Sequence, residues 1–303
     1  MSTRKDAKLH GLLAAVTTPF TADGSAIDEQ AIRWHAERLI TAGIHGLVPT
    51  GTTGEFPTLT PEEYRRVIEV YIEAVAGRVP VVPGIGQLST AATIELARYA
   101  QQAGADAIMV VPPFYDPLSF EAVKAFLGEL SAAIDLQIVY YNVPGCTGVR
   151  LGAAELAELG DIPGVDYLKD TSGDAVSLAE LLAVRGDRIK AFNGWDTLTF
   201  FGIASGAEGS VWGAAGIVPE QAMALWDALV EQQDLARARE LWRPLWELSS
   251  FLESVNYVAG VKTALELVGA PAGPARLPIL PLGEADRARL RDILDRMGML
   301  QKA

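Results

Sequence analysis

Short apolar runs and longer stretches with a single apolar face alternate along most of this chain. The short runs are rich in β-branched and aromatic residues and end at glycine, proline or polar residues, which is typical of buried strands. The stretches between them repeat apolar residues with the spacing of amphipathic helices. The eight runs that we interpret as strands lie within residues 11–20, 46–50, 79–86, 107–113, 137–148, 165–174, 188–194 and 209–215.

Helix start signals support this alternation. Thr60, Pro61 and Glu63 combine a capping threonine, a proline in the first turn and a glutamate that closes a capping box. Eight strand–helix pairs in about 230 residues predict a (β/α)₈ (TIM) barrel rather than an open doubly wound sheet, which usually has fewer strands. We therefore predict an α/β chain with a barrel over residues 1–232, which carries the active site, and a C-terminal helical appendage over residues 233–303.

Composition limits the partners of the protein. Half of its 303 residues are hydrophobic and 21% are charged, as in ordinary globular proteins. The net charge of −13 argues against a nucleic-acid or anionic-membrane partner, because either would require a basic surface. The single cysteine excludes an internal disulfide and a thiolate-rich metal site, and it suits a reducing cytoplasm. The polar residues 1–10 and the interrupted apolar run after them predict neither a signal peptide nor a membrane span.

Lys169 and Tyr141 stand at the ends of two predicted neighbouring strands. Desolvation disfavours the ammonium form of a lysine and frees its lone pair to attack a carbonyl carbon, which gives a Schiff base. Because side chains alternate along a strand, Lys169 should share a face with Tyr167 and Val165, while Asp170 points away from it. The C-terminal strand ends of a barrel meet at one face, where Lys169 and Tyr141 can approach each other. A solvent-exposed lysine is the alternative interpretation.

A loop rich in glycine and threonine, residues 51–55, follows the second predicted strand. Its backbone N–H groups and two hydroxyls can bind a carboxylate without an arginine, although a simple capped turn would have the same composition. Tyr141 is long enough to bridge Lys169 and a substrate carbonyl and to transfer a proton. These residues together predict a site for a small carbonyl compound that carries a carboxylate.

Neither a metal centre nor another cofactor is expected. The histidines lack the spacing of metal ligands; they are His10, His35 and His45. The glycine-rich residues 204–216 could bind phosphate near the last two strands, but glycines of this kind are more often required for tight turns.

These motifs resemble those of the dihydrodipicolinate synthase and N-acetylneuraminate lyase superfamily, which are class I Schiff-base aldolases on a (β/α)₈ barrel. The resemblance extends over nearly the whole chain, and several motifs in the right order make it specific for the family rather than for one member. The segments that carry it are residues 51–55, 141–148, 168–171, 261–267 and 273–278.

The resemblance implies that Lys169 forms an imine with a 2-keto acid, usually pyruvate, and that Tyr141 relays protons. It implies that Thr52 and Thr53 hold the carboxylate, with Thr52 also in the proton path. Tyr115 would enter the site of a neighbouring subunit, which implies a homo-oligomer, commonly a dimer of dimers. The further substrate contacts that we expect at the strand ends are Gly51, Thr171, Asn193, Gly194, Asp196, Val211 and Cys146.

Two departures bear on the substrate. Synthases of the family usually carry an arginine where this chain has Cys146, and a charge-assisted bond to a carboxylate contributes about 1.5–3 kcal/mol. Arg150, four residues further on, could compensate. Sialic-acid lyases have a small acidic run after strand seven, whereas Trp195 in this chain would crowd a long polyol.

The leading hypothesis is a lyase that makes or breaks a carbon–carbon bond between pyruvate and a small aldehyde, acting on a 4-hydroxy-2-oxo or 2-keto-3-deoxy acid. Residues 54–60 and 169–174 look similar to 4-hydroxy-2-oxoglutarate aldolases. The alternatives are 4-hydroxy-tetrahydrodipicolinate synthase proper, a dehydratase of 2-keto-3-deoxy sugar acids, and a keto-acid-binding barrel without turnover.

Overall fold

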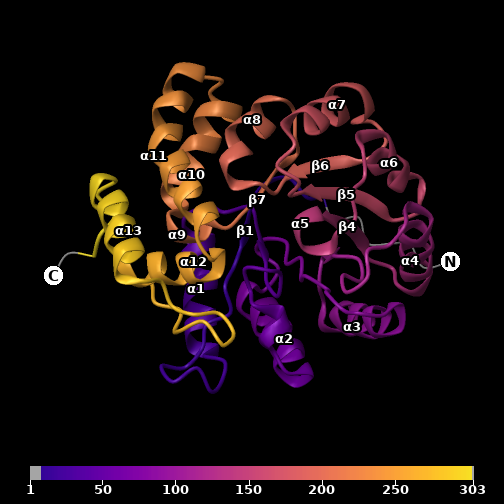
Figure 1. Cartoon of the computed structure of the whole chain (residues 1–303), viewed down its shortest axis with the longest axis horizontal. Coiled ribbons are helices and arrows are strands. Elements are labelled where there is room, and N and C mark those ends of the chain that lie inside the picture. Colours follow the sequence, from indigo (N-terminus) through magenta and orange to yellow (C-terminus); the bar gives the residue numbers. More distant parts are fainter. Residues whose placement is uncertain (1–7, 302–303) are drawn as a thin grey trace.

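Parallel strands form a ring at the centre of the molecule, in a computed structural model that describes residues 8–301 (Figure 1). Residues 1–7 and 302–303 lie outside this description. They include part of the polar N-terminus, the start of the predicted barrel segment 1–232 and the end of the predicted appendage 233–303. The hydrogen-bonded order of the strands is β2-β1-β7-β6-β5-β4-β3. They are β1 (Gly11–Ala15), β2 (Gly46–Val48), β3 (Ala107–Val110), β4 (Gln137–Asn142), β5 (Val165–Asp170), β6 (Lys190–Asn193) and β7 (Gly209–Trp212).

The third predicted strand, residues 79–86, closes the ring without forming a regular strand. It lies between β2 and β3 and pairs with them through isolated bridges, Leu47 with Val81 and Gly84 with Met109. The carbonyls of Pro80 and Pro83 accept hydrogen bonds from the two neighbours, but proline has no N–H to donate in return. The predicted α/β barrel with C-terminal helices is confirmed, and residues 79–86 are its one irregular strand position.

Helices surround the ring and follow the strands in sequence (Figure 1). The predicted capping box is confirmed, since Thr60 caps α2 and Glu63 bonds back to the Thr60 N–H. The helices of the barrel are α1 (Glu29–Thr41), α2 (Pro61–Val75), α3 (Thr90–Ala103), α4 (Phe120–Ala133), α5 (Pro144–Thr147), α6 (Ala153–Glu158), α7 (Ala175–Arg185), α8 (Thr199–Ala204), α9 (Ala214–Ile217) and α10 (Pro219–Trp226). Short helical turns complete this part at Phe56–Thr58, Leu159–Asp161, Asp196–Leu198 and Asp227–Glu231.

The interior of the ring is filled by side chains from alternate strand positions, among them Val139, Tyr141 and Tyr167. Tyr167 lies on the Lys169 face, as predicted, but Val165 packs in the layer between strands and helices. A register shift between β4 and β5 causes this difference, because Ile138 pairs with Val165 while Val139 already pairs with Tyr167. Such a bulge reverses the alternation of side chains before it.

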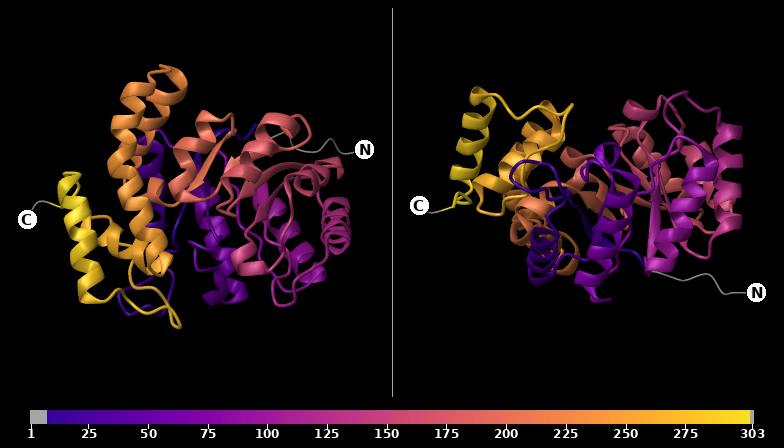
Figure 2. Two further views of the ribbon diagram at one scale, coloured as in Figure 1. Left: turned by 45° about the horizontal axis from the view of Figure 1, so that its top comes forward. Right: turned by 90° about the horizontal axis from the view of Figure 1, so that it is seen from below.

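Three helices follow the barrel: α11 (Leu235–Ser254), α12 (Tyr257–Leu267) and α13 (Glu284–Arg296). Figure 2 shows α13 on the outer side of this group, away from the strands. The buried residues of α11 and α12, including Phe251 and Val261, belong to the same apolar cluster as Ile32 of α1 and Trp212 of β7. The C-terminal helices therefore pack on the barrel through a continuous core. Among residues 8–301, no helix is both long and apolar enough to cross a membrane.

Replacing Phe251 with alanine should lower the free energy of unfolding by about 3–5 kcal/mol, because it empties a fully buried site shared by α11 and the barrel. Trp246→Ala on the same helix is the control; its side chain is about half exposed, so we expect a loss of less than about 1 kcal/mol. Chemical denaturation measures both. Equal losses in the two variants would contradict a shared core.

Candidate active site

A cavity of about 510 Å³ opens at the C-terminal ends of the strands. In a barrel this face carries the chemistry, because loops from every strand converge there. Nine of the residues predicted from the sequence line the cavity; they are Thr52, Thr53, Tyr141, Cys146, Lys169, Thr171, Gly194, Asp196 and Val211. Arg150 and Trp195, the two residues that bear on the substrate, line it as well.

Lys169 lies beside Tyr141 at the floor of this cavity. The two residues pair across β4 and β5, and the Lys169 Nζ is 4.1 Å from the centroid of the Tyr141 ring. Only 5% of Lys169 is exposed. Asp170 points away, as predicted, and accepts hydrogen bonds from Asn142 and Ser172. Lys169 is thus a buried amine next to a phenol and open to a cavity.

Gly194 makes room for this lysine. A Cβ atom at position 194 would lie 2.7 Å from Cε of Lys169 and 2.2 Å from Oγ1 of Thr171. Both distances are too short for real contacts, so any side chain would displace the lysine or the threonine. The glycine at the end of β6 is therefore required by the lysine on β5.

The loop of residues 51–55 forms a tight turn at the cavity wall. The Gly54 N–H bonds to the Gly51 carbonyl, and the Glu55 N–H bonds to the Thr52 carbonyl. A Cβ at Gly54 would lie 2.8 Å from the backbone N of Thr50, so the turn needs a glycine there. Gly51 itself lines a small adjoining hollow with Tyr141 rather than the main cavity. The turn presents Thr52 and Thr53 to the cavity opposite Lys169.

Besides Gly51, two further predicted residues do not reach the cavity in the described chain. Asn193 is fully buried, and its amide donates to the Trp195 carbonyl and to the hydroxyls of Thr199 and Ser210. Its side chain is committed to joining β6, β7 and α8, which explains why it is not available to a ligand. Tyr115 is 85% exposed, in the loop after β3. A single chain leaves Tyr115 outside its own site.

Tyr257 and Glu253, which come from the C-terminal helices, were not found by sequence reasoning and also line the cavity. The Tyr257 hydroxyl donates to Oδ2 of Asp196 at 2.6 Å, above Gly213, where a Cβ would lie 2.1 Å from that hydroxyl. Glu253 accepts hydrogen bonds from the N–H and the hydroxyl of Thr197. Their sequence signal is only a helical period, which does not reveal that the start of α12 reaches the barrel mouth.

Burial raises the pKa of Asp196 to about 7, while the Tyr257 hydroxyl and the positive charge of Lys169 oppose this rise. Burial also raises the pKa of Glu253, against its bonds with Thr197. The cavity therefore contains an acid that can hold or release a proton near neutral pH. Such a group is suited to proton transfer or to binding a substrate hydroxyl.

Asp196→Asn should change how stability depends on pH. Because the pKa of Asp196 is higher in the folded state than the ordinary 3.8, its stabilising contribution is complete below about pH 4 and is lost as the pH rises through about 7. Relative to the asparagine variant, the wild type should lose about 4 kcal/mol over this range. Denaturation at a series of pH values measures the difference, and parallel curves for the two proteins would contradict the assignment.

No group of three or more histidine, cysteine, aspartate or glutamate side chains within residues 8–301 could hold a metal ion. Each histidine has another environment. His35, for example, is buried, and its Nε2 lies 3.2 Å from the Pro271 carbonyl.

A parallel barrel that buries one lysine against a tyrosine at its C-terminal face, opposite a loop of hydroxyls, defines a lysine-dependent (β/α)₈ enzyme. The chain belongs to the dihydrodipicolinate synthetase family, whose model matches residues 8–297. The resemblance stated from the motifs is thereby confirmed. The members of this family are lyases that use a lysine Schiff base with pyruvate, and this protein is a lyase of that class.

Similar proteins match over most of their length. A 4-hydroxy-tetrahydrodipicolinate synthase of Thermomicrobium roseum is 41% identical over 93% of this chain and 92% of its own. An uncharacterized DapA-like lyase of Halobacterium salinarum is 37% identical over 96% of this chain and 95% of its own. The crystal structure of a dihydrodipicolinate synthase from Acinetobacter baumannii, complexed with pyruvate, superposes with a TM-score of 0.92 at 30% identity and covers 97% of this chain and 100% of its own.

Proposed function

We propose that this enzyme forms an imine between Lys169 and pyruvate, or a related 2-oxo acid, and uses it to make or break a carbon–carbon bond to a small aldehyde. The observation that carries the proposal is the position of Lys169, a buried amine 4.1 Å from the Tyr141 ring on the floor of the cavity. Membership of a family of Schiff-base lyases supports it.

The reaction in the synthetic direction starts with attack of the Lys169 amine on C2 of the 2-oxo acid. The carbinolamine loses water to give an iminium ion, and loss of a proton from C3 gives an enamine. C3 then forms a bond to the aldehyde carbon, whose oxygen takes up a proton. Water adds to the new imine and releases the product and the free amine. Cleavage follows the same steps in reverse.

Tyr141 is the group that we assign to proton transfer, because its phenol is the side chain beside the lysine that can both donate and accept a proton. We assign the carboxylate of the 2-oxo acid to Thr52 and Thr53, whose turn lies at the cavity wall. The acceptor would then lie toward Thr171, Asp196 and Cys146, with Gly194 and Val211 in the wall.

We favour a small 4-hydroxy-2-oxo or 2-keto-3-deoxy acid as the substrate, because the cavity has Cys146 and two carboxyl groups at the acceptor side. A second candidate is 4-hydroxy-tetrahydrodipicolinate synthase itself. It is favoured by Arg150, which lines the same cavity and could bind the carboxylate of a second substrate, and by the name of the Thermomicrobium roseum relative.

A turnover panel separates these candidates. Aldol cleavage of 4-hydroxy-2-oxoglutarate or 2-keto-3-deoxygluconate releases pyruvate, whereas a dehydratase releases water and a different oxo acid. The synthase consumes pyruvate only when aspartate semialdehyde is present. Pyruvate released from one of the first two compounds is the expected result, and pyruvate binding without turnover of any compound would leave only a binding protein.

We further propose that the enzyme is a homo-oligomer, a dimer of dimers, in which Tyr115 completes the site of a neighbouring subunit. The exposure of this aromatic residue, in a loop next to the barrel mouth, supports the proposal. Light scattering should give a mass above that of one chain, and a monomer that retains full activity would exclude this role for Tyr115. The single cysteine, which is free, fits a reducing compartment such as the cytoplasm.

A further inference from the structure

The C-terminal appendage contacts the loop of residues 51–55 through a buried ion pair. The Nζ of Lys262, on α12, lies 2.6 Å from Oε1 of Glu55, and the exposed fractions of the two side chains are 4% and 0%. Lys262 also donates a hydrogen bond to the Pro274 carbonyl. Burial lowers the pKa of Lys262 to about 8, against the raising effect of Glu55, so this amine is still mainly protonated at pH 7.

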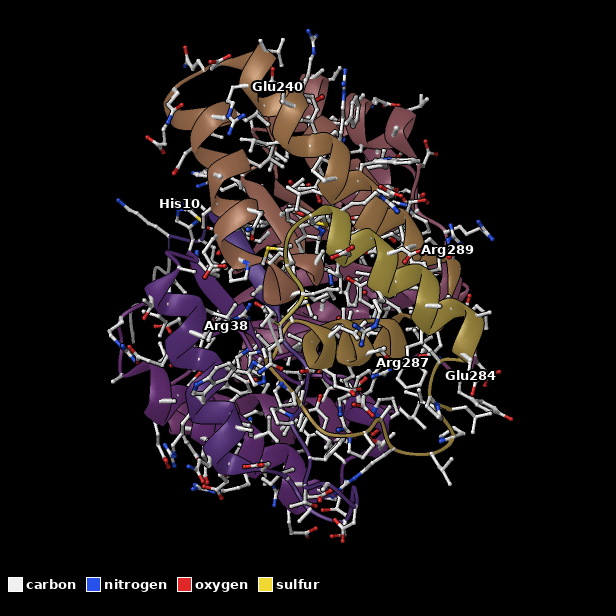
Figure 3. The ribbon with its side chains drawn as sticks, turned by 90° about the vertical axis from the view of Figure 1, so that its left-hand side faces the viewer. His10, Arg38, Glu240, Glu284, Arg287 and Arg289 are labelled. Carbon is white, nitrogen blue, oxygen red and sulfur yellow. The ribbon has the colours of Figure 1, made fainter. Side chains whose placement is uncertain are left out.

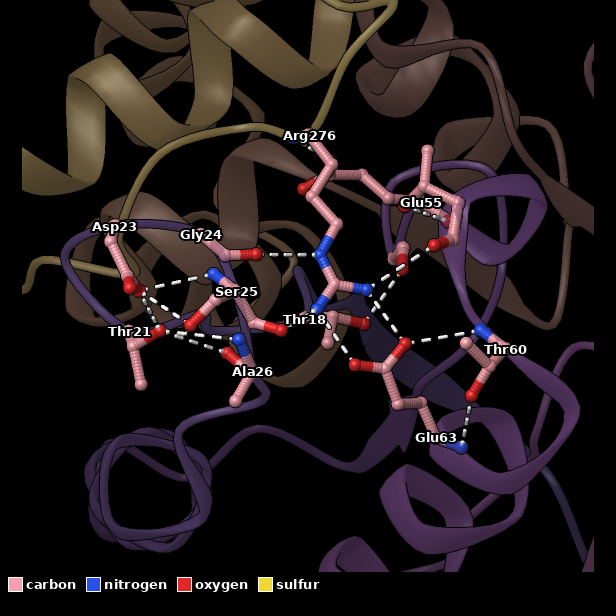
Figure 4. Close-up of polar contacts among 12 residues, drawn as sticks. Thr18, Thr21, Asp23, Gly24, Ser25, Ala26, Glu55, Thr60, Glu63 and Arg276 are labelled. Carbon is pink, nitrogen blue, oxygen red and sulfur yellow. Dashed lines mark hydrogen bonds and ion pairs between the residues drawn. The ribbon is translucent and has the colours of Figure 1, made fainter.

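The second oxygen of Glu55 is held by the same part of the chain. Oε2 accepts a hydrogen bond of 2.9 Å from the backbone N–H of Arg276. The guanidinium of Arg276 bonds with both oxygens of Glu63 on α2 and donates to the carbonyl of Gly24, as Figure 4 shows. Both carboxylate oxygens of Glu55 are thus fixed by residues that follow the barrel in sequence.

Glu55 is the last residue of the turn that carries Thr52 and Thr53. Its φ of 57° places it in the left-handed region, where a residue other than glycine is strained. Its N–H closes the turn on the Thr52 carbonyl. Anchoring the Glu55 side chain therefore fixes the backbone that presents the two hydroxyls to the cavity.

Stability alone does not account for this pair. The desolvation of two buried charges cancels much of the free energy that their mutual attraction provides. Apolar residues of similar size often stabilise a protein as well as such a pair does. The location of the pair supplies a reason. An unpaired carboxylate three residues from Thr52 would repel an anion bound at the turn, and Lys262 cancels that charge.

We propose that Lys262 and Glu55 are positioning residues for the substrate carboxylate: the pair holds the Thr52–Thr53 turn in shape and keeps the local charge neutral. The C-terminal helices are then part of the binding site and not only a cover for the barrel. This inference rests on the proposed function, since it takes the ligand of the turn to be the carboxylate of a 2-oxo acid.

The test measures the fraction of Lys169 reduced onto pyruvate by borohydride, as a function of pyruvate concentration, in the full-length protein. Lys262→Met should raise the half-saturating pyruvate concentration about tenfold or more, because it leaves Glu55 charged and unpaired. The maximal modified fraction should stay the same. Adding Glu55→Gln to Lys262→Met should restore the half-saturating concentration to within about threefold of the wild type.

Arg287→Met is the matched control. Arg287 forms an exposed ion pair with Glu266, which lies on α12 like Lys262, and Figure 3 shows Arg287 on the outer side of the C-terminal helices. Its removal should leave the half-saturating concentration unchanged. A purely structural role of Lys262 would lower the denaturation midpoint of Lys262→Met without moving that concentration, and this result would overturn the inference.

The outcomes separate the two proposals. Absence of any adduct in the wild type contradicts the imine and hence the proposed function. An adduct in the wild type with the same half-saturating concentration in folded Lys262→Met contradicts only the positioning role. If Lys262→Met does not fold, Glu55→Ala carries the test: it removes the carboxylate that anchors the turn, so the half-saturating pyruvate concentration should rise about tenfold, and an unchanged concentration in this folded variant overturns the inference.

Discussion

Replacing Lys169 with methionine should abolish turnover and the pyruvate adduct while leaving the fold intact. Only 5% of Lys169 is exposed, so its replacement must fill a buried space. Methionine has a similar length and flexibility and no nucleophilic amine. Loss of a covalent intermediate should lower kcat by about 10⁴-fold or more. Steady-state kinetics on the substrate found in the turnover panel give this ratio.

Lys190→Met provides the control. Lys190 is the first residue of β6, the strand next to that of Lys169, and it is exposed. It lies at the opposite end of the barrel from the cavity, and its Nζ is 5.7 Å from the centroid of the Tyr167 ring. Its replacement should leave kcat within about twofold, because a surface charge far from the site has little effect on the reaction. Retention of kcat in Lys169→Met would end the assignment of the nucleophile.

Tyr141→Phe should lower kcat by about 10²–10⁴-fold, which is the usual contribution of a positioned proton-transfer group. Phenylalanine keeps the ring beside Lys169 and removes only the hydroxyl, so the adduct with pyruvate should still form at Lys169, but slowly. The matched control is Tyr140→Phe: Tyr140 is the adjacent residue of β4, equally buried but in the layer between the strands and the helices.

Rapid-quench measurement of imine formation separates the two effects of Tyr141. A slow imine step in Tyr141→Phe together with normal kinetics in Tyr140→Phe would support proton transfer by the phenol. Equal, small losses in both variants would mean that Tyr141 serves only to pack against the lysine.

Local pattern and barrel geometry are sufficient to predict from the sequence which residues lie together in the candidate site. Lys169 and Tyr141 end neighbouring apolar runs, and the rule that strand ends meet at one face places them together, as the structure does. The same rule predicts that the loop of residues 51–55 lies at this face. The sequence also predicts that residues 79–86 belong to the ring. It does not predict a regular strand there correctly, because the prolines of this segment lack the N–H donors that a regular strand requires.

The features that sequence reasoning missed all depend on long-range contacts. The bulge that turns Val165 away from the lysine leaves no periodic signal before the strands are paired. Tyr257 and Glu253 enter the cavity from helices whose pattern shows only one apolar face. Asn193 stands at a strand end like the cavity residues, but its partners Thr199 and Ser210 hold it inside.

The most direct measurement for this account is a peptide map of the protein after borohydride reduction with pyruvate. We predict one reduced pyruvyl group, located on Lys169, with no modification of Lys190 or Lys262 and none when borohydride is added without pyruvate. An adduct on another lysine, or an active preparation without any adduct, would contradict the imine on which the account depends.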